Sequence, residues 1–81
     1  MVDKPTIAKE MAEKWSIKPV LADKMADILV FLADKEFSTS VAISQEVGMP
    51  ATTVKRYLRQ LVSMGYVAAH GANKNRTYNI V

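Results

Sequence analysis

Residues 43 to 67 read ISQEVGMPATTVKRYLRQLVSMGYV, and this stretch decides the fold. Its apolar residues recur at helical spacing on both sides of a central glycine. The spacing predicts a short helix over about 40–47, which Gly48 ends as a C-terminal cap would. A second helix is predicted over about 52–64, where Gly65 stops it. Two helices joined by a tight turn are therefore expected in the middle of the chain.

The second of these helices carries an apolar face and several bases. Its apolar positions recur at i, i+4 and i+7, namely Val54, Leu58 and Leu61. Between them stand three basic residues, Lys55, Arg56 and Arg59. Thr52 or Thr53 is expected to cap or open this helix, because a threonine hydroxyl can accept a hydrogen bond from an N–H group of the first turn. The helix is thus expected to bury one face and to present positive charge on the other.

The sequence before this stretch predicts two more helices. A short apolar stripe at i, i+4 and i+8 is formed by Ile7, Met11 and Trp15. Pro19 interrupts the pattern, since a proline disfavours helix at the residue before it. The strongest helical pattern then runs from residue 19 to about 35, with an apolar face made of Leu21, Met25, Ile28, Leu29 and Leu32. This helix is expected to be the scaffold, and Phe37 beyond it an apolar anchor.

After Gly65 the hydrophobic period changes from helical to two. YVAAH and TYNIV are typical of strands, and GANKNR between them supplies residues that tolerate a positive φ angle. A β-hairpin with a basic tip is expected. The predicted fold class is α+β, mainly α with a small hairpin, with a three-helix core plus an additional N-terminal helix. Residues 1–18 are interpreted as a helical extension or linker, and residues 19–81 as the domain.

Composition narrows the class of protein. A chain of 81 residues has room for one domain. It contains no cysteine, so disulfides and thiolate metal sites are excluded. No apolar run approaches the length that crosses a bilayer, and the charged N-terminus lacks the apolar stretch of a signal peptide. A cytoplasmic domain without a membrane partner is expected.

Charge is distributed unevenly along the chain. Residues 1–36 hold six lysines and seven acids, a net charge of −1, whereas residues 37–81 hold five bases and one acid, a net charge of +4. Such asymmetry favours a polyanionic partner for the basic half. The competing interpretation is an ordinary solvated surface, because three bases on an exposed helix, taken alone, form such a surface as often as a binding site.

These features together resemble the winged helix-turn-helix domain of bacterial and archaeal regulators. The resemblance covers about residues 20–81 and rests on ISQEVGMPATTVKRYLRQLVSMGYV followed by NKNRTY. The first helix has its apolar residue, Ile43, before the turn glycine, and the second opens with small or polar residues followed by Val54, Arg56 and Leu58. Pro50 departs from the family, which more often has a serine at this helix cap.

The resemblance implies that the helix of residues 52–64 enters the major groove of double-stranded DNA. Nearest the base edges would lie Thr52, Thr53 and Lys55, and Arg56 would lie one turn-face along. Arg59 would contact a phosphate, and Lys74 and Arg76 in the hairpin loop, residues 71–77, would touch the backbone or reach into the minor groove. The implied role is transcriptional regulation, with no cofactor. Similar winged helices are appended to larger proteins, including Fic-domain nucleotidyltransferases, and the end of the chain on the last wing strand favours an excised C-terminal module.

A rival interpretation keeps the fold and changes the partner. The same winged helix can be a protein-interaction or dimerisation module whose bases meet an acidic protein, and a homodimer through the N-terminal segment stays open. Individual residues also have two interpretations. Tyr57 either packs against the scaffold helix or stacks on a base. Ser40 and Ser44 either cap the helix or face solvent, or they contact phosphate.

No catalytic constellation is visible in the sequence. His70, the one histidine, has no carboxylate or serine partner at a motif spacing, and neither a glycine-rich phosphate loop nor a metal-ligand spacing occurs. Asp23 and Asp27 share a helical face at i and i+4, but the interleaved Lys24 favours a solvated polar face. The chain is expected to be no enzyme and to hold no metal.

Overall fold

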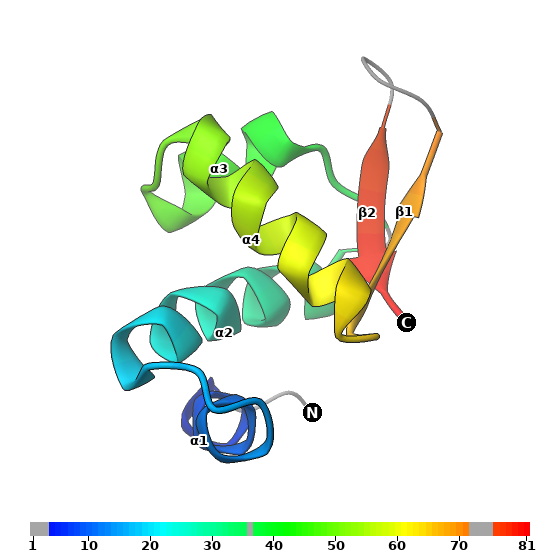
Figure 1. The fold of residues 1–81 in the computed structure, drawn as a ribbon. Helices are drawn as coiled ribbons and strands as arrows, with labels where there is room; N and C mark the ends of the chain where they lie inside the picture. The colour runs from blue at the N-terminus through cyan, green and yellow to red at the C-terminus, as the bar shows by residue number, and fades with distance from the viewer. Residues whose placement is uncertain (1–3, 36, 72–75) are drawn as a thin grey trace.

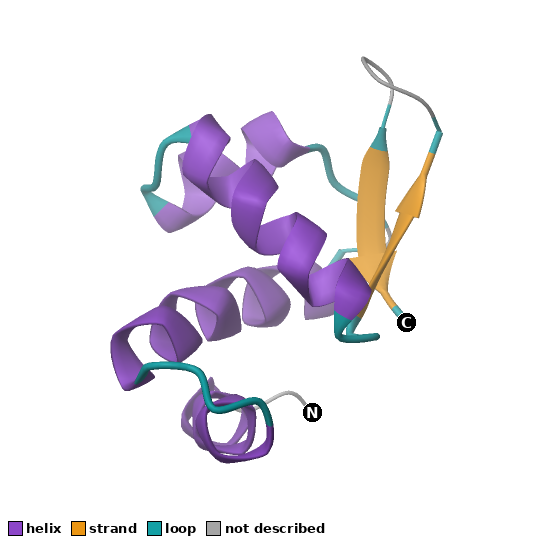
Figure 2. Ribbon diagram, in the orientation of Figure 1, coloured by secondary structure: helices purple, strands orange, loops and turns teal. Residues whose placement is uncertain are grey.

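The computed structural model describes residues 4–35, 37–71 and 76–81. The elements in chain order are α1 (Lys4–Lys14), α2 (Pro19–Ala33), α3 (Ser40–Val47), α4 (Ala51–Ser63), β1 (Val67–His70) and β2 (Thr77–Ile80). Figures 1 and 2 show the helices gathered beside a two-stranded hairpin. The expected fold class, mainly α with a small β-hairpin, is confirmed. Within the described ranges, no helix combines the length and the apolar character that crossing a membrane requires.

α2 is the scaffold because it presents a continuous apolar face. Pro19 occupies its first turn, where the missing N–H group costs no helical hydrogen bond. Its buried residues recur at helical spacing, and they are Ala22, Met25, Ala26, Ile28, Leu29 and Leu32. Three other elements pack against it, namely α1, α3 and β2. The core is therefore organised around this one helix.

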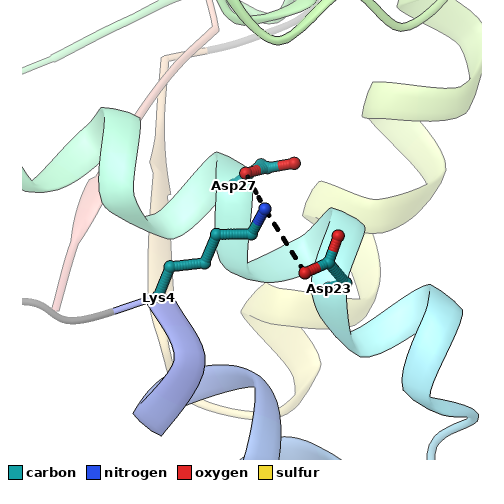
Figure 3. A network of polar contacts seen from close by, with 3 residues as sticks. All are labelled: Lys4, Asp23 and Asp27. Carbon is teal, nitrogen blue, oxygen red and sulfur yellow. Dashed lines mark ion pairs between the residues drawn. The ribbon is translucent and has the colours of Figure 1, made fainter.

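α1 packs against α2 and contributes to the same core. Met11 is completely buried, and Ile7 packs partly buried against the cluster. At the start of α1, Lys4 Nζ lies 2.9 Å from Asp27 Oδ1 and 3.3 Å from Asp23 Oδ1, as Figure 3 shows. The hydrogen bond to Asp27, and then that to Asp23, raises the pKa of Lys4 above its ordinary value of 10.5. The two aspartates thus hold α1 rather than forming a purely solvated face.

The other end of α1 reaches the junction between α4 and the hairpin. Trp15 Nε1 donates to the Tyr66 hydroxyl at 3.2 Å, and this hydroxyl donates to Glu10 Oε2 at 3.4 Å. Trp15 nevertheless stays 40% exposed. It ties the end of α1 to Tyr66 and still offers part of its ring to solvent. The division into an extension of residues 1–18 and a domain of residues 19–81 stays a prediction.

α3 begins and ends where local chemistry dictates. The Thr39 hydroxyl accepts a hydrogen bond from the Ala42 N–H at 3.2 Å, which makes Thr39 the N-cap. Gly48 ends the helix with φ at +73°, a left-handed conformation that suits glycine, and its N–H donates to the Ser44 carbonyl. The predicted bounds of this helix and its glycine stop are confirmed.

α4 begins one residue earlier than the sequence predicts. Pro50 occupies the cap position, with ψ at 144° and no side-chain cap, and the first helical residue is Ala51. Of the two expected roles, capping and opening the helix, Thr52 and Thr53 take the second, because both lie inside the first turn and no side chain caps it. Figure 1 shows α4 running from the turn after α3 to the base of the hairpin.

β2 is paired on both of its edges. Along one edge it pairs antiparallel with β1, from Val67 opposite Ile80 to His70 opposite Thr77. Along the other, Ser38 and Tyr78 exchange two backbone hydrogen bonds, of 3.0 and 2.8 Å. Because Thr39 and α3 follow Ser38 directly, this bridge fixes the start of α3 against the hairpin. We call β1, β2 and the loop between them the wing.

Phe37 does not anchor the core. Its side chain is 56% exposed and meets the His70 ring edge-on, with the ring centroids 5.3 Å apart. The expectation of an apolar anchor at this position is wrong, because the backbone bridge of Ser38 to β2 does the tethering. His70 in turn lies on β1, as predicted, with Nε2 2.7 Å from Asn79 Oδ1.

Candidate nucleic-acid interface

α4 buries one face and divides its exposed face into two stripes. The buried side is made of Val54, Tyr57, Leu58 and Leu61. One exposed stripe, at i, i+4 and i+7, contains Lys55, Arg59 and Val62. The other contains Thr52, Arg56 and Gln60, all exposed. The three bases of this helix therefore do not all face the same way.

The first stripe lines a groove between α4, the start of α3 and the wing. We call this feature the basic groove. It has a volume of about 400 Å³ and is lined by Thr39, Ser40, Val41, Lys55, Arg59, Val62, Ala69, Arg76 and Tyr78. Three of these side chains are cationic and none is acidic. Charges separated by up to 21 positions in the sequence, from Lys55 to Arg76, thus converge on one hollow.

The start of α3 adds backbone donors to the same groove. The first N–H groups of a helix have no intrahelical acceptor. Here the Thr39 hydroxyl accepts from Ala42 and the Thr39 carbonyl accepts from Ile43. The N–H groups of Ser40 and Val41 remain, and both residues line the groove. This end of a helix favours negative charge.

The predicted site residues fall into three groups. Lys55, Arg59 and Arg76 meet in the basic groove. Thr52 and Arg56 lie on α4, exposed and outside the groove lining. Thr53 is half-buried on the same helix, and Lys74 lies outside the described residues. The DNA-contacting role of all seven stays a prediction.

Two residues with open interpretations are placed by the structure. Tyr57 is 8% exposed and belongs to the core cluster, so it packs and does not stack on a base. The Ser44 hydroxyl donates to the Val41 carbonyl at 2.8 Å, within its own helix. Ser40, by contrast, lines the groove.

Thr39 and Tyr78 line the groove without any signal from a motif. Thr39 stands in a run of three hydroxyl residues, 38–40, and such a run predicts a helix cap without saying what surrounds it. Tyr78 belongs to a strand pattern, which says that one face is inward but not which helix it meets. Their shared location depends on the bridge between Ser38 and Tyr78, a pairing 40 residues apart in the chain.

Other chemistry finds little support in the described part of the chain. In residues 4–35, 37–71 and 76–81, no group of three or more histidine, aspartate or glutamate side chains could hold a metal ion. Asp23 and Asp27, the one carboxylate pair noted in the sequence, are both within 3.3 Å of Lys4 Nζ. The groove, by contrast, is lined by three cations and no acid.

Several solved structures share this fold. The Zalpha domain from Carassius auratus PKZ, solved in complex with Z-DNA, superposes with a TM-score of 0.71 at 22% identity, over 76% of this chain and 98% of that one. TrmBL2, an archaeal chromatin protein, superposes with a TM-score of 0.70 at 19% identity, over 98% of this chain and 28% of that one. At these identities the likeness concerns the fold. A search of curated proteins finds no match.

A family model gives the more specific result. The model of the IclR helix-turn-helix domain matches residues 21–71, which is more than half of the chain. The matched segment begins in α2 and contains α3, the turn, α4 and β1. The winged helix-turn-helix resemblance drawn from the sequence is thereby confirmed, and the chain belongs to the IclR helix-turn-helix domain family.

Proposed function

We propose that this chain binds double-stranded DNA in transcriptional regulation, with α4 in the major groove and the wing against the adjacent backbone. The observation that carries the proposal is the basic groove, where cations of α4 and of the wing converge without an acid among the lining residues. A single duplex lying across α4 would meet both elements at once. Phosphate contacts of this kind supply most of the affinity of DNA-binding proteins.

The two stripes of α4 suggest a division of labour. Arg56 and Thr52, exposed near the start of the helix, are free to meet base edges, and Thr53 and Lys55 lie next to them. The planar fork of an arginine can bond to the O6 and N7 atoms of guanine together. Arg59 and Arg76, which flank the basic groove, would contact phosphates, as would Lys74 in the wing.

The comparisons support this proposal independently of the charges. Membership of the IclR helix-turn-helix family supports a DNA-binding role in a regulator. The Zalpha domain was solved with Z-DNA, and TrmBL2 is described as having a novel mode of DNA binding. TrmBL2 is also several times longer than the segment matched here, which is compatible with a module of a larger cytoplasmic regulator.

The test is a binding measurement on a duplex selected from a random pool, followed by fluorescence anisotropy. Arg56→Ala should weaken binding by about 1–3 kcal/mol if Arg56 contacts a base. Lys24→Ala is the matched control, because it removes one exposed positive charge from α2 and should leave the affinity unchanged. Equal losses of affinity for Arg56→Ala and Lys24→Ala would mean that only general positive charge attracts the DNA.

Failure of the pool to yield any binding duplex would overturn the proposal. In that case the rival function, a protein-interaction or dimerisation module, would be the one to pursue. Sedimentation of the free domain would then show whether it forms a homodimer.

A further inference from the structure

The basic groove contains more than cations. We propose that it is a discrete binding site for one phosphate group, which inorganic phosphate occupies in the free domain and a backbone phosphate occupies in a DNA complex. The second half of this statement rests on the proposed function, whereas the first half does not. The distinction matters, because dispersed surface charges attract any anion, but a built site selects one by its geometry.

Two hydroxyl groups are the first sign of a built site. Ser40 is 9% exposed and Tyr78 is 8% exposed, so both are more than nine-tenths buried, and both line the groove. Neither side chain has a hydrogen-bond partner among the described residues. No completely buried side-chain nitrogen or oxygen atom of the described residues lacks a partner, so these two unpaired hydroxyl oxygens keep access to solvent. Both are therefore available to a ligand in the groove. A phosphate oxygen in the groove would accept a hydrogen bond from each hydroxyl.

Backbone donors lie beside these hydroxyls. The N–H groups of Ser40 and Val41 are left unpaired at the start of α3, since the Thr39 hydroxyl and carbonyl take the next two. The helix dipole adds partial positive charge at the same place. The hydroxyl of Tyr78 and the end of α3 come from distant parts of the chain, and the Ser38–Tyr78 bridge holds them together.

Cations enclose the site from two sides. Lys55 and Arg59 are one turn apart on α4, and Arg76 precedes β2. Apolar side chains, Val41, Val62 and Ala69, line the remainder of the groove. This mixture suits a phosphate attached to a sugar, because the donors meet the charged oxygens while the sugar lies on the apolar part.

The experiment follows the backbone amides of isotope-labelled domain at constant pH. Sodium phosphate and sodium chloride are titrated separately at equal ionic strength. Phosphate should give saturable shifts at Ser40 and Val41, and chloride should not. Tyr78→Phe and Ser40→Ala should each bind phosphate roughly tenfold more weakly, the effect of one lost charge-assisted hydrogen bond. Ser63→Ala is a matched control, since Ser63 is exposed at the end of α4 and is not among the residues that line the groove.

A DNA arm separates this inference from the proposed function. Phosphate should displace a bound duplex more strongly than chloride at equal ionic strength, and Tyr78→Phe should remove that excess. Identical, non-saturating shifts with both salts would overturn the phosphate site, even if DNA binds. Saturable phosphate binding without DNA binding would support the site, identify its ligand as a free phosphate compound, and overturn the proposed function. Amide spectra of Tyr78→Phe and Ser40→Ala check that each variant folds, and one folded variant is enough for the comparison with the wild type.

Discussion

Simultaneous removal of the three groove charges should change the salt dependence of DNA binding by a calculable amount. The variant combines Lys55→Gln, Arg59→Gln and Arg76→Gln. Each neutralised phosphate contributes about −0.9 to the slope of log affinity against log salt concentration. If Arg56 also neutralises a phosphate while it reaches a base edge, the four described bases of α4 and the wing give a wild-type slope of about −3.6, and the variant retains about −0.9. Lys74 would add about −0.9 to both slopes if it also meets a phosphate.

The difference is large enough for a simple assay. Between 50 and 200 mM salt, the wild-type affinity should fall about 150-fold and that of the variant about 3.5-fold. Fluorescence anisotropy with one labelled duplex at several salt concentrations gives both slopes.

A matched control removes the same amount of charge elsewhere. Lys9→Gln, Lys18→Gln and Lys24→Gln together take the formal net charge from +3 to 0, as the groove variant does, but on the side of α1 and α2. This control should keep a slope close to that of the wild type. Equal slopes for the two triple variants would refute the reasoning, because the groove would then contribute nothing beyond net charge.

Three further outcomes concern the scaffold that holds this surface. Met11→Ala should lower the free energy of unfolding by about 2–5 kcal/mol in urea denaturation, since Met11 of α1 is completely buried in the core. A loss below about 1 kcal/mol would mean that α1 is not docked in solution. The raised pKa of Lys4 implies that its ion pairs stabilise the fold fully below pH 10.5, and that this contribution is lost as the pH rises through the higher folded-state pKa. The free energies of unfolding of the wild type and of Lys4→Met should therefore converge at strongly alkaline pH. A constant difference between them across that range would count against the ion pairs. Gly48→Ala should lower the free energy of unfolding by roughly 1–2 kcal/mol, as followed by thermal unfolding. The loss comes from the positive φ alone, because nothing lies within 4 Å of the added methyl group. An unchanged melting temperature would contradict the left-handed turn.

Local patterns predicted the helices well because their determinants are local. α3 has the predicted bounds, since a hydroxyl cap and a glycine stop lie within the segment itself. The start of α4 was missed by one residue, because Pro50 takes the cap position without a side-chain hydrogen bond. The two strands followed from their alternation and from the turn residues between them.

The site was only partly predictable. The sequence identified the cations, since charge is visible in the residue type, but it could not show that Arg59 lines a groove with Arg76 while Arg56 lies outside the groove lining. It also gave no indication that Tyr78 and Ser40 share a groove. Their meeting depends on a one-residue bridge between Ser38 and β2, and such a long-range pairing leaves no periodic pattern in the chain.

The most direct test of DNA binding is a map of the surface that a duplex covers. Isotope-labelled domain is titrated with a short DNA duplex at low salt, and the backbone amide shifts are followed. Salt-sensitive shifts should be confined to residues 51–59, to residues 71–77 and to the start of α3. Shifts that cluster on α1 around Trp15, or none at all, would contradict the account and leave the winged helix without its proposed partner.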